Sequence, residues 1–312
     1  MLGSFTWPVN ADELATPGGA RAVLRRFGIR PSKRWGQHFL VSGRVLRRIL
    51  TAASIGPDDS ILEVGAGMGT LTLGLANLAR CVTAVEVDRA LLPALQSTAG
   101  RLPNVRIVQG DILELAPSAL FGGPPGAPRK VVANLPYNIA AAVLTRLLAR
   151  APGLTLLVVT VQREVAERIA AHPGTRAYGI LSVATQFRAR PRILGRIPAG
   201  AFLPPPDVES AVLELVPLPA PPVDVPDERV LFQVVAAGFG QRRKTLANAL
   251  AGGLGVPKEA AVRACGRAGI DPRARAETLD LPAFAALTLA LLSDLPTPAP
   301  ADEKGLGMKL RE

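Results

Sequence analysis

The stretch Asn134-Leu135-Pro136-Tyr137 places an amide, a proline and an aromatic ring directly after an apolar run. The exocyclic amine of a nucleobase is a weak nucleophile because its lone pair is delocalised into the ring. The Asn134 side-chain oxygen and the Pro136 carbonyl, by accepting the N–H hydrogens, would free that lone pair. Tyr137 would stack on a base taken out of its helix or loop. The alternative is an ordinary turn, because Asn and Pro are common turn residues.

A glycine-rich loop precedes this stretch in the chain. It reads Gly65-Ala66-Gly67-Met68-Gly69, and glycines let the backbone turn tightly and approach a ligand closely. A dinucleotide fingerprint would require its last glycine at position 70, where this chain has Thr70. The loop therefore indicates a nucleoside-type ligand other than NAD.

Two acids follow later apolar runs, and both fit the recognition of an adenosine. Glu86 is placed to accept hydrogen bonds from ribose hydroxyls, and Asp111 to accept from an adenine amino group. No basic clamp for a phosphate accompanies them, which suits S-adenosylmethionine. A sulfonium methyl is already activated, so positioning for in-line attack would supply most of the catalysis. The alternative is that both acids are helix N-caps or loop acids.

The elements that must position these residues alternate between strand and helix. Apolar runs predict strands at 61–64, 81–87, 105–110, 130–134 and 154–161, and helical spacing predicts helices at 70–79, 89–97, 141–150 and 163–171. Such alternation predicts an α/β fold with a parallel sheet covered on both faces. Ligands then bind at the carboxyl ends of the strands. Segments 188–198 and 209–217 predict a late strand pair.

The 312 residues exceed what one core usually supports, so two domains are expected. Proline density marks a linker at 218–228, after which helices predict a small domain at 229–295. A tail at 296–312 is polar and expected to be disordered. Residues 1–27 are expected to form an N-terminal extension with a basic helix, which leaves 28–217 as the catalytic domain.

Composition limits the partners. The net charge is +11, which favours a polyanion, although any one cluster of arginines is more often a solvated face. Two cysteines and two histidines cannot supply a Cys/His zinc site, and no metal is expected. The N-terminus lacks a signal-peptide pattern, and the longest apolar stretch, 283–292, is too short to cross a bilayer. We therefore expect a cytoplasmic protein without membrane contact.

Several motifs together resemble one family, the small-subunit (16S) rRNA adenine N6-dimethyltransferases of KsgA type. They stand in family-like order: KRWGQHFL (33–40), ILEVGAGMGTLT, VEVD, QGDIL, NLPYNI, FLPPPDVESAV (202–212) and FGQRRKTLANAL (239–250). The resemblance implies a seven-stranded, Rossmann-like class I methyltransferase core with a small C-terminal helical domain. It also implies S-adenosylmethionine as cofactor.

The resemblance also assigns residues to roles. The cofactor would lie against His38 and Leu40 at its methionine end, against Gly65 and Gly67 at the glycine turn, and against Glu86, Asp111 and Asn134. Tyr137 and Phe202 would hold the target adenine between them. Basic clusters around the mouth would bind RNA phosphates, with the C-terminal contribution from Arg188, Arg190, Arg242, Arg243 and Lys244.

The implied reaction is dimethylation of two adjacent adenines in the 3′-terminal hairpin loop of 16S rRNA. It would occur late in assembly of the small ribosomal subunit, on the subunit or its precursor, by a monomer. One alternative is an Erm-type 23S rRNA dimethyltransferase, which confers macrolide resistance. Another is a non-catalytic RNA-binding assembly or transcription factor. The NLPYN and FLPPPDVESAV sequences favour the first function over the second, and the intact site residues favour catalysis over the third.

Overall fold

The computed structural model describes residues 10–292, so the predicted disordered tail at 296–312 lies outside the described residues. The described chain divides into two compact units. The first comprises residues 10–166 and 192–217, and the second comprises residues 167–191 and 218–292. The predicted proline-rich linker, 218–228, begins at the last of the three junctions between the units, between residues 217 and 218. The segment 167–191 was not expected to belong with the C-terminal helices.

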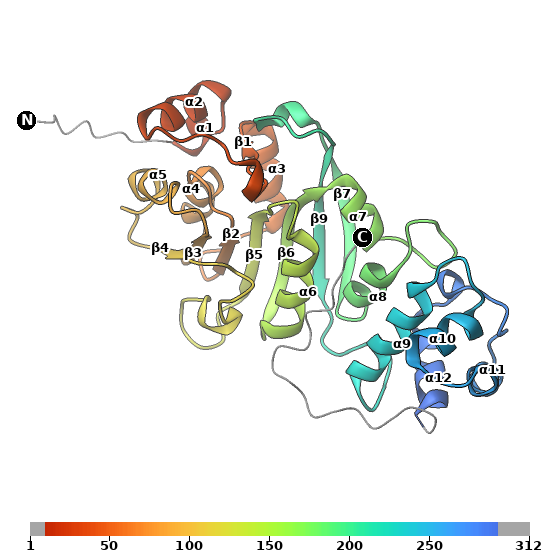
Figure 1. Ribbon diagram of the computed structural model, residues 1–312. Coiled ribbons are helices and arrows are strands. Elements are labelled where there is room, and N and C mark those ends of the chain that lie inside the picture. Colours follow the sequence, from red (N-terminus) through yellow and green to blue (C-terminus); the bar gives the residue numbers. More distant parts are fainter. Residues whose placement is uncertain (1–9, 293–312) are drawn as a thin grey trace, which may run out of the picture. The chain divides into compact units, whose positions relative to one another are not determined.

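A seven-stranded sheet forms the centre of the first unit (Figure 1), as the resemblance implied. Its order is β4-β3-β2-β5-β6-β9-β7. The neighbours from β4 to β6 pair in parallel, and β9 runs antiparallel to β6. The strands span Ser60–Val64 (β2), Cys81–Glu86 (β3), Val105–Gln109 (β4), Arg129–Asn134 (β5), Leu154–Gln162 (β6), Ala189–Ile197 (β7) and Ser210–Pro217 (β9).

The register of the parallel strands brings their carboxyl ends together. Val64 pairs with Val85, Glu86 pairs with Gln109, and Asn134 pairs with Thr160. All five residues of β2 are buried, which fits a central strand covered on both faces. The loops after β2, β3, β4 and β5 therefore leave the sheet at one edge, where a ligand site is expected.

Helices and a short second sheet complete the first unit. The two-stranded sheet pairs Phe39–Leu40 (β1) with Phe202–Leu203 (β8). The helices are Ala11–Leu14 (α1), Pro17–Arg26 (α2), Gly43–Ala53 (α3), Thr70–Ala76 (α4), Leu92–Thr98 (α5) and Ala140–Arg150 (α6), and Arg163–Ile169 (α7) crosses into the second unit. Short 3₁₀ turns lie at Lys33–Trp35, Pro117–Ala119 and Ala199–Ala201.

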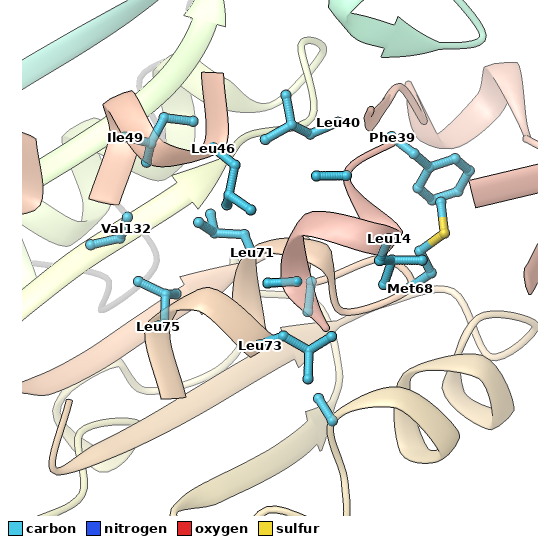
Figure 2. Close-up of a cluster of buried hydrophobic side chains, with 14 of the residues drawn as sticks. Leu14, Phe39, Leu40, Leu46, Ile49, Met68, Leu71, Leu73, Leu75 and Val132 are labelled. Carbon is cyan, nitrogen blue, oxygen red and sulfur yellow. The ribbon is translucent and has the colours of Figure 1, made fainter. Parts of the chain in front are cut away.

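The described part of the N-terminal extension is integral to the core. Leu14 of α1 is fully buried and belongs to the same hydrophobic cluster as Met68 and Leu73. Figure 2 shows Leu14 near Met68, with Phe39 on the other side of the methionine. An apolar side chain at the end of a four-residue helix thus anchors a segment that the sequence pattern presented as an appendage.

The second unit is helical around aromatic side chains. Phe187 meets Phe232 edge to face at 5.4 Å between ring centroids, and Tyr178 meets Phe239 at 5.9 Å. These contacts explain why 167–191 belongs with the C-terminal helices. Its helices are Ile180–Gln186 (α8), Glu228–Gly240 (α9), Leu246–Leu254 (α10), Lys258–Arg267 (α11) and Leu281–Leu291 (α12), with a 3₁₀ turn at Ala276–Thr278. No helix within residues 10–292 could span a membrane.

Candidate functional site

A cavity opens at the carboxyl edge of the sheet in the first unit. It is lined by the loops after β2, β3, β4 and β5 and by the segment that leads into β1. These loops supply every residue predicted to touch the cofactor, together with three of the four predicted catalytic residues: His38, Leu40, Gly65, Gly67, Glu86, Asp111, Asn134, Pro136 and Tyr137. The structure therefore brings together residues that are almost a hundred positions apart in the chain.

The glycine turn depends on backbone conformations that favour glycine. Gly65, Gly67 and Gly69 have φ angles of +72°, +61° and +91°. A Cβ on Gly69 would lie 2.6 Å from the Thr98 hydroxyl oxygen, and one on Gly65 would lie 3.2 Å from the Pro136 ring. The turn is thus packed directly against the loop that carries Asn134. Side chains at these positions would strain the backbone and crowd the cavity wall.

The two predicted acids both line the cavity and both hold their own loops. Glu86 is 5% exposed, and its carboxylate accepts the Gly67 N–H at 2.7 Å and the Asp88 N–H at 2.9 Å. Asp111 accepts the Leu113 N–H at 2.8 Å. Burial raises the pKa of Glu86. The alternative interpretation of these acids as loop residues is thus compatible with ligand contact, because each carboxylate oxygen has a second lone pair.

Glu63 is a third acid in the wall of the cavity, and the sequence motifs assign it no role. It is 2% exposed within β2, and it accepts a hydrogen bond from the Thr72 hydroxyl at 2.6 Å. Burial raises the pKa of Glu63 to about 8, and the nearby Glu86 carboxylate adds to the shift. The signal available in the sequence was an acid inside an apolar strand, SILEV, where a charged residue requires a reason.

A second residue that the sequence analysis did not single out, Gln37, ties two walls of the cavity together. Its amide oxygen accepts the Ser32 N–H at 2.8 Å, and its amide nitrogen donates to Asp88 at 2.6 Å. Asp88 follows β3, and Ser32 follows α2. The bond from Gln37 to Asp88 therefore fixes the segment before β1 against the end of β3.

The amide nitrogen of Asn134 has a hydrogen-bond partner, and its amide oxygen has none among the described residues. Its Nδ2 donates to the His38 carbonyl at 2.9 Å, which fixes the orientation of the amide because a carbonyl can only accept. Its Oδ1 is buried and has no hydrogen-bond partner among the described residues. A buried acceptor without a partner is uncommon in folded proteins, so a missing donor is indicated.

Tyr137 is held at both ends. Its hydroxyl is hydrogen-bonded to the Ser210 hydroxyl, and its ring is stacked on the His38 ring at 5.2 Å between centroids with a 24° interplanar angle. His38 Nδ1 lies 2.8 Å from the Pro204 carbonyl and therefore donates to it. The Pro136 carbonyl already accepts the Ile139 N–H at 3.2 Å, which leaves one lone pair for another donor.

Phe202 is buried in the structure, and its predicted role stays a prediction. It was expected to face Tyr137 across the target adenine, but its side chain is 3% exposed and belongs to the hydrophobic core. The reason is that β8 pairs with β1, where Phe202 lies opposite Leu40. The ring that stacks on Tyr137 in this structure is that of His38.

The predicted RNA-binding arginines fall into two groups. Arg188 pairs with Glu228 and lies 5.2 Å from the Phe187 ring centroid, and Arg242 donates to the Tyr178 carbonyl at 2.6 Å. Both therefore hold the second unit together. Arg190, Arg243 and Lys244 are exposed and have no side-chain partner among residues 10–292.

The charge of the cavity wall selects among ligands. The lining residues in the described structure include the acids Glu86 and Asp111 and no Lys or Arg, and the third acid, Glu63, is mostly protonated at neutral pH because its pKa is raised to about 8. Such a wall repels phosphates and attracts cations. A phosphate-free adenosine that carries a positive charge fits it, and a sulfonium nucleoside has both properties. A dinucleotide with two phosphates does not fit.

Comparison with known proteins agrees with this chemistry. The family model described as ribosomal RNA adenine dimethylase matches residues 29–287. A protein of Pelotomaculum thermopropionicum named ribosomal RNA small subunit methyltransferase A is 46% identical, with 89% of this chain and 97% of that protein covered. A protein of the same name from Nocardia farcinica is 44% identical and covers 88% and 94% of the two chains. The family resemblance predicted from the motifs is confirmed.

Solved structures share the fold. The 23S rRNA methyltransferase ErmE superposes with a TM-score of 0.62 at 26% identity, over 81% of this chain and 99% of that one. A dimethyladenosine transferase from Plasmodium falciparum has a TM-score of 0.69 at 23% identity, over 82% and 98%. The fold prediction is therefore confirmed, with a seven-stranded sheet and C-terminal helices.

Proposed function

The chain belongs to the ribosomal RNA adenine dimethylase family, and we propose that Asn134 and Tyr137 bind the target adenine in its reaction. The protein is an rRNA methyltransferase of the small ribosomal subunit that uses S-adenosylmethionine. The cofactor supplies a methyl group activated by its sulfonium centre. The tasks left to the protein are to hold the cofactor, to orient the amine and to keep water away from both.

The unpartnered Asn134 Oδ1 carries the proposal. An adenine amine entering the cavity supplies the donor that this oxygen lacks. The bond strengthens as the nitrogen becomes tetrahedral and its hydrogens become more acidic, so it favours the transition state over the ground state. The Pro136 carbonyl is the second acceptor, through its remaining lone pair. Tyr137 supplies the stacking surface, held in place by Ser210.

The cofactor-binding roles are proposed for the residues that already form a rigid wall. Gly65 and Gly67 allow a close backbone approach, Glu86 accepts from the ribose hydroxyls, and Asp111 accepts from the adenine amine. His38 and Leu40 border the end nearest Asn134. The cationic charge of the cofactor is compensated by the acidic wall.

We further propose that the substrate is a pair of adjacent adenines in the 3′-terminal hairpin loop of 16S rRNA, methylated in the cytoplasm late in subunit assembly. The names of the relatives, which specify the small ribosomal subunit, support this substrate over that of ErmE. The monomeric state and the preference for a subunit precursor stay predictions.

The test is to map methylated adenines after incubation of the purified chain and S-adenosylmethionine with unmethylated small subunits. We expect two adjacent dimethyladenines near the 3′ end of 16S rRNA and none in large-subunit RNA under the same conditions. Methylation confined to 23S rRNA would establish the Erm-type alternative. Binding without any methyl transfer would establish the assembly-factor alternative.

A further inference from the structure

The N-terminal part of the first unit is unusually one-sided in charge. From Ala15 to Pro57 the chain contains eight Arg and one Lys but no Asp or Glu. The surface within this segment that stands out is a hollow lined by Arg21, Leu24, Arg25, Gly28, Ile29 and Arg30. It lies at the end of α2, in the first unit, apart from the cavity described above.

The hollow is built by the way α2 ends. Gly28 has a φ angle of +64° and turns the chain, so that the Ile29 N–H donates to the Leu24 carbonyl at 2.8 Å. Leu24 and Ile29 are both buried, at 7% and 9% exposure, and anchor the turn in the core. Arg30 is thereby folded back beside the helix end that carries Arg25. The turn thereby fixes the main chain that carries the three arginines.

The arginines of the hollow differ from Arg47 and Arg48, whose side chains are engaged within the protein. Arg47 pairs with Asp12, and Arg48 donates to main-chain carbonyls of β7. The side chains of Arg21, Arg25 and Arg30 are exposed and have no hydrogen bond or ion pair among residues 10–292, the range that the structure describes. The C-terminal end of a helix favours one cation. Like charges at Arg21 and Arg25, one helical turn apart, instead repel each other.

The hollow is also close in sequence to the segment that lines the cofactor cavity. Arg30 precedes Trp35, the first residue of the segment that lines the cofactor cavity, by five positions. Five residues span at most about 18 Å even when fully extended. Phosphates of an RNA that delivers a base into the cavity therefore come within reach of this surface.

We propose that Arg21, Arg25 and Arg30 form a docking surface for phosphodiester groups of the substrate RNA, close to the nucleotide that enters the cavity. This inference rests on the proposed function and adds to it a contact region that is separate from Arg190, Arg243 and Lys244. Guanidinium groups bind phosphate oxygens through paired N–H bonds, which positions the backbone without reading the sequence.

The experiment compares two triple variants of the full-length chain with equal loss of charge. One is Arg21→Gln, Arg25→Gln and Arg30→Gln, and the matched control is Arg101→Gln, Arg263→Gln and Arg273→Gln, three exposed arginines that do not line the hollow. Affinity for unmethylated small subunits is measured over a series of KCl concentrations. Glutamine is a good helix former, so α2 is kept. Melting temperature and S-adenosylmethionine binding are measured on the same samples.

The hollow variant is expected to bind subunits more weakly, with a salt slope reduced by about 2 because each lost phosphate contact removes roughly 0.7–0.9. The control triple keeps the wild-type slope, and both triples bind the cofactor as the wild type does. An unchanged slope in the hollow variant, or equal losses in the two triples, would overturn the docking surface. Failure of the wild type to methylate adenines would instead overturn the proposed function, whatever the slopes.

Discussion

Two parts of the cavity wall, the carboxylates proposed to face the cofactor and the amide proposed to face the target, differ in how far the protein satisfies their polar atoms. On the cofactor wall, Glu86 accepts two backbone N–H groups and Glu63 accepts the Thr72 hydroxyl. On the target wall, Asn134 keeps a buried oxygen without a partner. A buried acceptor left without a bond costs about 1–3 kcal/mol of desolvation.

This difference separates binding from activation. Carboxylates that are already held by hydrogen bonds are fixed before the ligand arrives, and so they position the cofactor at little entropic cost. A wall with an open acceptor becomes complete only when a donor enters. In the proposed roles, the open acceptor of Asn134 lies where the nucleophile must change its geometry.

Asn134→Ala removes the open acceptor on the target wall and should have the largest effect on turnover. Single-turnover methylation of small subunits at saturating cofactor should fall about a hundredfold or more, because an interaction that strengthens in the transition state is lost. The melting temperature should fall by no more than the loss of the Nδ2 bond to the His38 carbonyl requires, since Oδ1 has no protein partner to lose.

Asn104→Ala is the matched control for that variant. The Asn104 amide donates to the Ala76 and Ala79 carbonyls at 2.8 and 3.1 Å, so its removal should lower the melting temperature. Turnover per folded molecule should stay near that of the wild type. If Asn134→Ala behaves as Asn104→Ala does, with early melting and normal turnover, then the NLPY stretch is only a turn.

Variants of Tyr137 should have the next largest effect, on kcat/KM for the RNA. Tyr137→Ala removes a stacking surface worth about 1–3 kcal/mol, which corresponds to roughly a 5- to 150-fold loss of kcat/KM for the RNA. Tyr137→Phe keeps the ring but removes the hydroxyl contact to the buried Ser210, and we expect a loss of only a few-fold.

Ser210→Ala tests that contact from the other side. If the hydroxyl pair positions the ring, then the double variant Tyr137→Phe with Ser210→Ala should be no worse than the poorer single variant. Additive losses in kcat/KM would mean that the two hydroxyls act separately. Cofactor affinity, measured by calorimetry, should be the same in all of these variants.

A substitution of Glu63 tests the cofactor wall, and its effect should be the smallest of those predicted here. Its pKa is about 8 in the folded protein against 4.5 in an exposed chain, so the folded state holds one more proton between these values. The stabilisation from this group is full below about pH 4.5 and is lost as the pH rises through about 8. Glu63→Gln lacks this loss, and its melting temperature should exceed that of the wild type by several degrees at about pH 9.

The same substitution at Glu114, an exposed acid, serves as the control and should leave the pH dependence of the melting temperature unchanged. Well below pH 4.5 the wild type and Glu63→Gln should melt together, because the carboxyl group is then neutral in both the folded and the unfolded state. A constant difference between them at all pH values would mean that the pKa of Glu63 is not raised on folding.

The sequence by itself determined the strand ends and the residues that follow them. Apolar runs with turn residues after them are local patterns, and parallel strands necessarily place their carboxyl ends at one edge. Gly65, Glu86, Asp111 and Asn134 could therefore be assigned to one cavity before the fold was known.

Only the tertiary structure decided which side chains remain available for ligands. His38 reaches Pro204 and Tyr137 reaches Ser210 across 166 and 73 positions, and no local pattern encodes such pairs. The same holds for Arg188, whose partner Glu228 is 40 positions away, and for Phe202, which strand pairing buries. The residue types set what each group can do, but long-range packing sets whether the group is already engaged within the fold.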